Sequence, residues 1–173
     1  MKTYKELLKN ITTFIFDYDG VLTNGNVLLT PEGDALRTAH VKDGYALQLA
    51  VKQGYNIAII SGGYSQSMAR RFEALKIKDF FLAVDNKLEV FHKYLKDKNI
   101  NTKEVLYMGD DIPDLLSMKE AGLACCPADA SPEIISICHY VSPLKGGEGC
   151  VRDVIEQTLK IQDNWMKDNA FHW

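Results

Sequence analysis

Aspartates follow two of the short apolar runs in this sequence. They are Asp17, Asp19, Asp110, Asp111 and Asp114. Carboxylates that are brought together repel one another unless a hard cation neutralises them, and Mg²⁺ prefers such oxygen ligands while it keeps water and substrate oxygens in its shell. If the fold gathers these aspartates, the sequence predicts a magnesium site.

A second set of residues offers the donors and the positive charge that an anion needs. Ser61 is followed by Gly62 and Gly63, and Lys87 comes after another apolar run. The amides of a Ser-Gly-Gly turn and a lysine ammonium are suited to bind phosphate oxygens. Together with the aspartates, these residues predict phosphoryl transfer.

Short apolar runs alternate with stretches of helical periodicity, a pattern typical of a parallel sheet covered by helices. The predicted strands are 13–16, 56–60, 80–84, 105–108 and 123–126, and the predicted helices are 46–53, 65–75, 87–97, 113–121 and 151–165. We therefore expect the α/β class, with a doubly wound, mainly parallel sheet. In such a sheet ligands bind at the carboxyl ends of the strands, where the polar residues stand.

Residues 25–41 do not fit this alternation of strands and helices. They form two extended runs joined by Pro31, Glu32, Gly33 and Asp34, which predicts a β-hairpin. A chain of 173 residues with 46% hydrophobic content has the size of one domain, so we expect a single domain over 1–173 with the hairpin as an insertion. We expect the polar tail, residues 166–173, to extend from the surface.

Charge and composition exclude several classes of partner. The formal net charge is −3 and no Lys/Arg-rich run is present, so we expect no nucleic acid and no membrane surface as a partner. No apolar run approaches the roughly 20 residues that span a bilayer, and we expect a cytoplasmic protein. The four cysteines lack metal-ligand spacing and are interpreted as reduced packing residues; they are Cys125, Cys126, Cys138 and Cys150.

Four motifs in this order resemble those of the haloacid dehalogenase superfamily of phosphatases. FIFDYDGVLT is similar to the pattern DxDG[VT][LT], and IISGG resembles a second motif that ends a strand in Ser or Thr. Lys87 in VDNKLE resembles the third motif, and MGDDIPD resembles the fourth, GDDxxD. Each motif alone is weak, but together they indicate the superfamily.

The resemblance implies a role for each residue of the chemistry. Asp17 would attack phosphorus and form an aspartyl-phosphate. Asp19 would protonate the leaving oxygen and later activate water. Ser61, Gly62 and Lys87 would hold the phosphoryl oxygens.

The same resemblance implies how the metal is held. Mg²⁺ would be bound by the Asp17 carboxylate, the main-chain carbonyl of Asp19 and the Asp110 carboxylate. Asp111 and Asp114 would orient these ligands.

Nearly the whole chain resembles the capless subgroup of phosphatases that act on 3-deoxy-D-manno-octulosonate 8-phosphate. The shared segments are the hairpin in place of a cap domain, HVKDGYALQL, ADAS, HYV and GGEGCVRDV. The resemblance implies an acidic sugar phosphate as substrate, a place on the route to lipopolysaccharide, and a homotetramer whose neighbours close each site. Only about 40 residues separate Asp19 from Ser61, too few for a helix and a lid domain, so an open site independently favours an oligomer.

Two positions depart from the subgroup pattern. Gly63 stands where an arginine is common in octulosonate phosphatases and a glutamate in a related nine-carbon-sugar phosphatase. Glu148 stands where an arginine is common. Lys42 and Arg152 remain candidate cations for an acidic sugar.

Other interpretations stay open at this point. The substrate could be a nine-carbon ulosonate 9-phosphate of the KDN or sialic acid type, or the protein could be a non-catalytic regulator on a phosphatase fold. A phosphorylatable receiver domain fits poorly, because its acidic pair normally precedes the phosphorylated aspartate on another strand. Ser61 could merely cap a helix, and Asp111 and Asp114 could be helix-start acids. Surface or packing roles are expected for the histidines His40, His92, His139 and His172.

Overall fold

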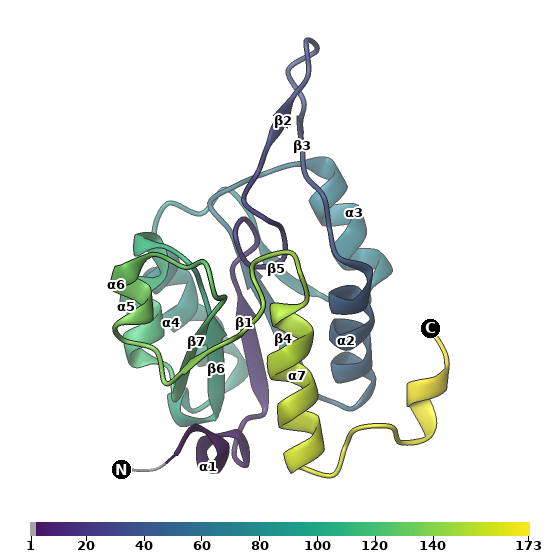
Figure 1. The fold of residues 1–173 in the computed structure, drawn as a ribbon, viewed down its shortest axis with the longest axis vertical. Helices are drawn as coiled ribbons and strands as arrows, with labels where there is room; N and C mark the ends of the chain where they lie inside the picture. Colours follow the sequence, from purple (N-terminus) through teal and green to yellow (C-terminus); the bar gives the residue numbers. More distant parts are fainter. Residues whose placement is uncertain (1–2) are drawn as a thin grey trace.

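The computed structural model describes residues 3–173, which contain a parallel sheet of six strands in the order β5-β4-β1-β6-β7-β8 (Figure 1). The strands are β1 (Thr13–Phe16), β4 (Asn56–Ile60), β5 (Asp79–Phe81), β6 (Val105–Met108), β7 (Leu123–Cys126) and β8 (Tyr140–Val141). All residues of β1 are buried, as expected for a central parallel strand covered on both faces. The α/β class and the mainly parallel sheet are therefore confirmed.

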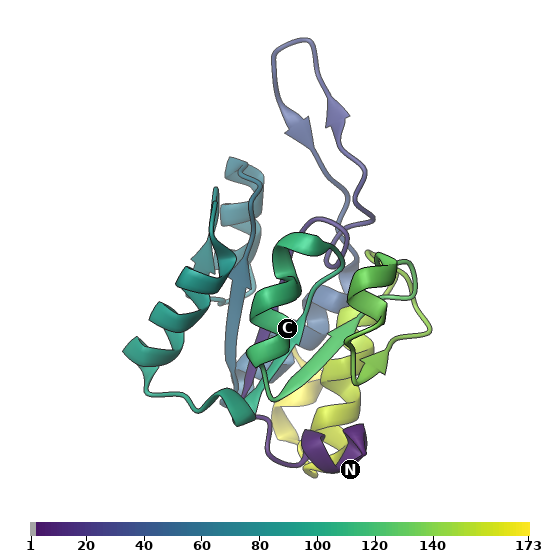
Figure 2. The ribbon, with the colours of Figure 1, turned by 90° about the vertical axis from the view of Figure 1, so that its left-hand side faces the viewer.

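Helices cover both faces of the sheet and enclose two separate apolar cores (Figures 1 and 2). Phe14 and Phe16 of β1 point into one core and Ile15 into the other, which is the period-two alternation of a strand. The first core is covered by α1 (Tyr4–Leu8), α2 (Val41–Lys52), α3 (Gln66–Ala74) and α7 (Cys150–Ile161). The second is covered by α4 (Lys87–Lys98), α5 (Leu115–Glu120) and α6 (Pro132–Ile135). Short 3₁₀ turns are η1 (Thr102–Glu104), η2 (Ile112–Asp114) and η3 (Asp168–Phe171).

Two predicted boundaries, the start of α2 and the end of β5, are wrong. At both, polar contacts with the backbone set where the element begins or ends. Helix α2 begins at Val41, before the predicted start at residue 46, because its polar first turn is anchored by Asp43, whose Oδ1 accepts a hydrogen bond from the Arg152 amide at 2.7 Å. Strand β5 ends at Phe81, because the next backbone bonds to a turn instead of the sheet: Val84 N donates to the Ser61 carbonyl at 3.0 Å.

The predicted hairpin is present and projects beyond the sheet (Figures 1 and 2). It consists of β2 (Leu28–Leu29) and β3 (Ala35–Leu36), which pair antiparallel. Gly33, at a φ of 91°, supplies the left-handed conformation that the tip requires. Leu28 and Leu29 are 67% and 76% exposed, so the hairpin presents apolar side chains to solvent.

The prediction that the C-terminal tail extends from the surface is wrong. Helix α7 ends at Ile161, and the chain then folds back so that η3 lies against α2. Tyr45 of α2 donates to the carbonyl of Ala170, and its ring meets that of Trp173 edge-on at 5.7 Å. The ring contact of Trp173 is not evident from the polar composition of the tail. Among residues 3–173 no helix combines the length and the apolarity needed to cross a bilayer.

Candidate active site

The carboxyl ends of β1, β4 and β6 lie side by side and border a cavity of about 450 Å³. The residues predicted for catalysis, phosphate binding and metal binding all line it: Asp17, Asp19, Ser61, Gly62, Lys87, Asp110, Asp111 and Asp114. Because neighbouring parallel strands end at one edge, motifs far apart in the sequence meet here.

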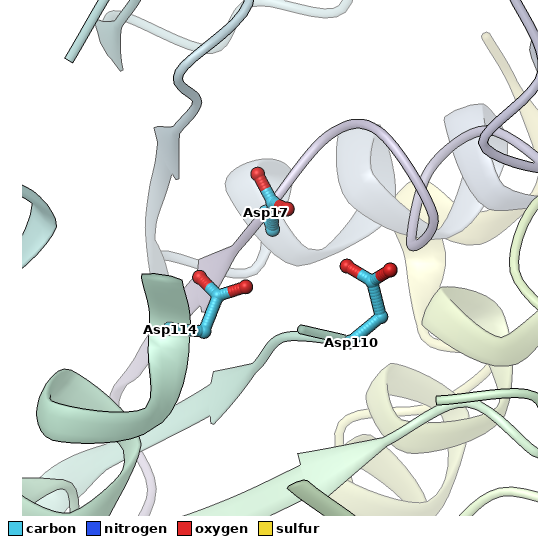
Figure 3. A group of neighbouring side chains, drawn as sticks. All are labelled: Asp17, Asp110 and Asp114. Carbon is cyan, nitrogen blue, oxygen red and sulfur yellow. The ribbon is translucent and has the colours of Figure 1, made fainter. Parts of the chain in front are cut away.

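Three of the carboxylates that line the cavity are close neighbours (Figure 3). Asp17, Asp110 and Asp114 each offer an oxygen, and these oxygens lie within 4.8 Å of one another. Burial, reinforced by the negative charge of Asp114, raises the pKa of Asp17 well above its usual range and that of Asp110 to about 6. Asp110 Oδ1 and Asp114 Oδ2 are buried without a hydrogen-bond partner among the described residues. A hard divalent cation would satisfy these oxygens, so the donor set fits Mg²⁺.

Lys87 supplies positive charge inside the cluster. Its side chain is 6% exposed, and Nζ lies 2.9 Å from Asp17 Oδ1 and 2.8 Å from Asp114 Oδ1. Burial alone would lower the pKa of Lys87, but the two aspartates outweigh it and raise the pKa above its usual value. The ammonium therefore stays charged beside the predicted nucleophile.

Tyr107 is a residue of the site that sequence reasoning missed. Its hydroxyl donates to Asp114 Oδ1 at 2.9 Å, and burial, then the charge of Asp114, raises the pKa of Tyr107 well above its usual range. The hydroxyl remains a donor that fixes Asp114 beneath the cavity. Because Tyr107 lies within the apolar run of β6, its polar end gave no separate signal.

Ser61 lines the aspartate cavity and does not cap α3. Its Oγ accepts a hydrogen bond from Gly63 N at 3.1 Å, and the residue is 1% exposed. The cap of α3 is Ser65, whose Oγ accepts from Met68 N at 3.3 Å. The capping interpretation of Ser61 is therefore wrong, and its hydroxyl lines the cavity.

The two acids after β6 differ in environment. Asp111 is exposed, and its Oδ1 accepts from Ile112 N at 2.8 Å at the start of η2, as a helix-start acid would. Asp114 is completely buried and makes no cap hydrogen bond, but it stands at the N-cap position of α5, where a negative charge favours the helix dipole.

Asp19 stands at the rim of the cavity and is paired with Arg37, a second residue that sequence reasoning missed. Arg37 Nε donates to Asp19 Oδ1 at 2.8 Å, and Nη2 donates to Oδ2 at 2.9 Å. Thr23 Oγ1 lies 3.4 Å from Asp19 Oδ1. No spacing rule connects Arg37 with Asp19, because the path of the hairpin between them decides where the guanidinium lies.

A glycine turn near the C-terminus rests on the loop that follows Asp19. A Cβ added at Gly146 would lie 1.9 Å from the carbonyl oxygen of Gly20, so the two backbones approach as closely as a glycine allows. Gly147 N donates to the carbonyl of Val21 at 2.9 Å. Gly20 itself has a φ of 88°, and a Cβ there would collide with Asp110 Oδ2.

The structure does not bring Lys42 and Arg152 to the aspartates. They line a different cavity of about 510 Å³ beside α2 and α7, together with Glu148. Arg152 pairs with Glu156, its Nε 3.0 Å from Oε2, and its guanidinium lies over the ring of Trp165 at 5.4 Å. Within one chain, Arg152 therefore packs on the surface of α7.

Packing or surface contacts are made by the four cysteines and by His92 and His139. All four cysteines are free thiols, as predicted. His92 Nε2 lies 2.7 Å from Glu120 Oε2 on the surface, and His139 Nδ1 accepts from Ala124 N at 3.0 Å.

The sequence and the fold are both similar to those of known proteins. Residues 39–128 match the family described as haloacid dehalogenase-like hydrolase. Over 154 residues the chain is 33% identical to the 3-deoxy-D-manno-octulosonate 8-phosphate phosphatase of Yersinia pestis, covering 89% of this chain and 82% of that protein.

Two solved structures of the same kind resemble the fold closely. The octulosonate 8-phosphate phosphatase of Moraxella catarrhalis, in complex with magnesium, phosphate and KDO, has a TM-score of 0.91 and 32% identity over 94% of this chain and 93% of its own. The cobalt-bound phosphatase of Haemophilus influenzae has a TM-score of 0.89 and 29% identity over 95% of this chain and 98% of its own.

Proposed function

This chain belongs to the haloacid dehalogenase-like hydrolases, and from that membership we propose that it is a phosphatase that hydrolyses an acidic sugar phosphate through an aspartyl-phosphate. The observation that carries the proposal is the convergence of a nucleophile, an acid/base, an ammonium and a carboxylate cluster on one cavity. No single motif would support it as strongly.

Asp17 is the proposed nucleophile. Its Oδ1 accepts hydrogen bonds from Tyr18 N at 2.7 Å and from Lys87, which orients the carboxylate and leaves Oδ2 to attack. The bond from this oxygen to phosphorus forms as the ester P–O bond breaks, and Asp19 gives its proton to the leaving oxygen. Water then attacks phosphorus, Asp19 takes a proton from it, and Asp17 is restored as phosphate leaves.

Other residues hold the phosphoryl group during these steps. The Ser61 hydroxyl, the Gly62 amide and the Lys87 ammonium would bind its oxygens and offset the charge of the transition state. Lys87 is buried between two aspartates, so its charge acts in a medium that screens it weakly.

Mg²⁺ is the proposed cofactor, held by the carboxylates of Asp17 and Asp110 and the main-chain carbonyl of Asp19. When bound it would neutralise the carboxylates and let two anions approach each other. Asp111 and Asp114 would orient the site, and Tyr107 would fix Asp114. The magnesium complex of the Moraxella catarrhalis relative supports this assignment.

The proposed substrate is 3-deoxy-D-manno-octulosonate 8-phosphate, which would yield KDO and phosphate in the cytoplasm on the route to lipopolysaccharide. The named activities of the relatives favour it over a nine-carbon ulosonate 9-phosphate and over a non-catalytic regulator. Gly63 and Glu148 depart from the subgroup pattern and make the sugar the part of the proposal that most needs an assay.

We further propose a homotetramer. The aspartate cavity of the monomer opens to solvent, and the hairpin exposes Leu28 and Leu29. Burial of these leucines between copies would remove apolar area from water, and a neighbour near the cavity would exclude water from the chemistry.

Phosphate release from a panel of sugar phosphates tests the function. Octulosonate 8-phosphate with Mg²⁺ should have the highest kcat/KM, EDTA should abolish turnover, and the nine-carbon 9-phosphates and neutral sugar phosphates should react more slowly. Equal slow turnover of every ester would contradict the narrow substrate. Complete inactivity of the Mg²⁺-loaded protein on every ester would favour the regulator.

A further inference from the structure

The hairpin delivers one arginine to the rim of the active-site cavity. Arg37 follows β3, yet its side chain is only 9% exposed, because the guanidinium lies against Asp19. Two parallel hydrogen bonds, of 2.8 Å and 2.9 Å, join its Nε and Nη2 to the two carboxylate oxygens. A bidentate pair of this kind sets the plane of a carboxylate as well as its position.

The pair is anchored on both sides. On the hairpin side, Arg37 Nη1 donates to the carbonyl of Ala35 at 2.8 Å. On the other side, Thr23 is completely buried, and its hydroxyl meets Asp19 Oδ1 at 3.4 Å and accepts from Gly20 N at 3.3 Å. Asp19 is thus held between the loop after β1 and the hairpin.

Gly63 leaves the room that this pair occupies. A Cβ at position 63 would lie 2.8 Å from Asp19 Oδ2 and 3.1 Å from Arg37 Nη2. The first distance is closer than real side chains approach, so any larger residue would push the carboxylate or the guanidinium aside. Gly63 therefore leaves the pair undisturbed, whereas a Cβ would displace the far end of one of its two side chains.

We propose that Arg37 is a positioning residue for catalysis: it holds Asp19 as an oriented carboxylate, the form that takes a proton from the attacking water when the aspartyl-phosphate is hydrolysed. Gly63 leaves space for this pair. The inference rests on the proposed function, because it acts through Asp19 as the acid/base. The residue that follows hairpin strand β3 would thus act in the active site of its own chain. Asp19 has no rigid secondary structure of its own to orient it, which is why a second element has this task.

The two steps of the reaction separate this role from others. Formation of the aspartyl-phosphate releases p-nitrophenolate from p-nitrophenyl phosphate without a proton on the leaving oxygen, whereas hydrolysis of the aspartyl-phosphate needs a base for the attacking water. Arg37→Met should therefore lower kcat on octulosonate 8-phosphate and on p-nitrophenyl phosphate by about 10- to 100-fold, and rapid mixing should show a burst of about one p-nitrophenolate per subunit before the slow steady state. Arg37→Lys should recover only part of the loss, because an ammonium cannot form the two parallel bonds.

A second variant tests the same contact from the other side. Gly63→Ala leaves Arg37 and Asp19 in place in the sequence but crowds their pair, so it should show the same burst with a smaller loss of kcat than Arg37→Met. The matched control is Arg70→Met, which removes an exposed arginine of α3 beside the same hairpin and should leave both rates unchanged. Circular dichroism confirms that each variant is folded.

Each alternative gives a different result. A loss of kcat in Arg37→Met without a burst of p-nitrophenolate would mean that Arg37 acts before the aspartyl-phosphate forms or only in folding, and a higher KM for the acidic sugar with unchanged kcat would mean that Arg37 binds substrate; either result overturns the proposal. A wild-type protein that hydrolyses neither ester would instead overturn the proposed phosphatase function, and with it the role of Arg37.

Discussion

At the scale of single residues, Asp17 is the group on which the covalent mechanism depends. Lys87 and Tyr18 N hold one of its oxygens, so its orientation is set before substrate arrives. A substitution that keeps its shape and removes its charge separates chemistry from folding.

Asp17→Asn should lower kcat by about 1,000-fold or more, because the amide cannot serve as the nucleophile. The melting temperature without metal should not fall, since one of the mutually repelling carboxylates is lost. Phosphate release and differential scanning calorimetry measure the two effects. Wild-type turnover in this variant would exclude an aspartyl-phosphate on Asp17.

Asp110 links the metal to stability. Burial raises its pKa to about 6, so the folded protein holds this proton more tightly than the unfolded chain does. The ionised carboxylate therefore destabilises the metal-free fold, increasingly as pH rises from about 4 to about 6, and this cost persists above that range.

Asp110→Asn removes that cost and a metal ligand together. In EDTA at pH 8 the variant should be more stable than wild type by on the order of 1 kcal/mol, and the difference should shrink as pH falls below about 6. Saturating Mg²⁺ should raise the melting temperature of wild type far more than that of the variant. An equal response of both proteins to Mg²⁺ would remove Asp110 from the metal site.

Three of the residues predicted from the sequence, Asp17, Ser61 and Asp110, share one property: each comes within two residues after the end of an apolar strand. Asp17, Ser61 and Asp110 could be placed together because parallel strands end at one edge. Arg37 and Tyr107 could not, for different reasons. The position of Arg37 depends on the three-dimensional course of the hairpin, and the hydroxyl of Tyr107 is carried by a residue that packs as an apolar one.

At the scale of elements, periodicity located most strands and helices but not their polar ends. The first turn of α2 contains Asp43 and Gly44, which belong to no apolar stripe, and it forms because Asp43 binds the backbone of α7. The tail was predicted wrongly because the partner of Trp173 is Tyr45, more than a hundred residues earlier. Such contacts are properties of the packed molecule and have no local signature.

The turn at Gly146 is an element whose effect on activity can be tested. Gly146→Ala should lower the free energy of unfolding by about 1–3 kcal/mol and also reduce kcat, because the added Cβ displaces the loop that carries Asp19. Gly54→Ala is the control: its Cβ would meet open space, so strain at its φ of 86° should reduce stability without changing kcat. Urea denaturation and steady-state kinetics measure both variants. Unchanged kcat in Gly146→Ala would separate this turn from the site.

At the scale of the whole molecule, the hairpin is the most exposed apolar feature near the site. It projects away from both cores, so its leucines gain nothing from the fold of one chain (Figures 1 and 2). Contacts between chains in an oligomer would bury these leucines.

Light scattering after size exclusion should report about 78 kDa, four times the chain mass of 19.5 kDa. The double variant Leu28→Ser and Leu29→Ser should form smaller species, because the exposed apolar area of the hairpin is lost. Leu116→Ser, which alters a leucine of α5 that is 58% exposed, should leave the mass unchanged. A monomeric wild type would contradict the tetramer.

Gly146 and Gly147 contact the backbone of residues 20 and 21. This contact determines when, during synthesis of the chain, the loop beside the nucleophile is supported. Asp17 is synthesised more than a hundred residues before the glycine turn that supports the loop beside it. A nascent chain that lacks this turn has its aspartates but not the contact that holds their loop. Catalytic competence should therefore be acquired only after residues 146 and 147 have left the ribosome.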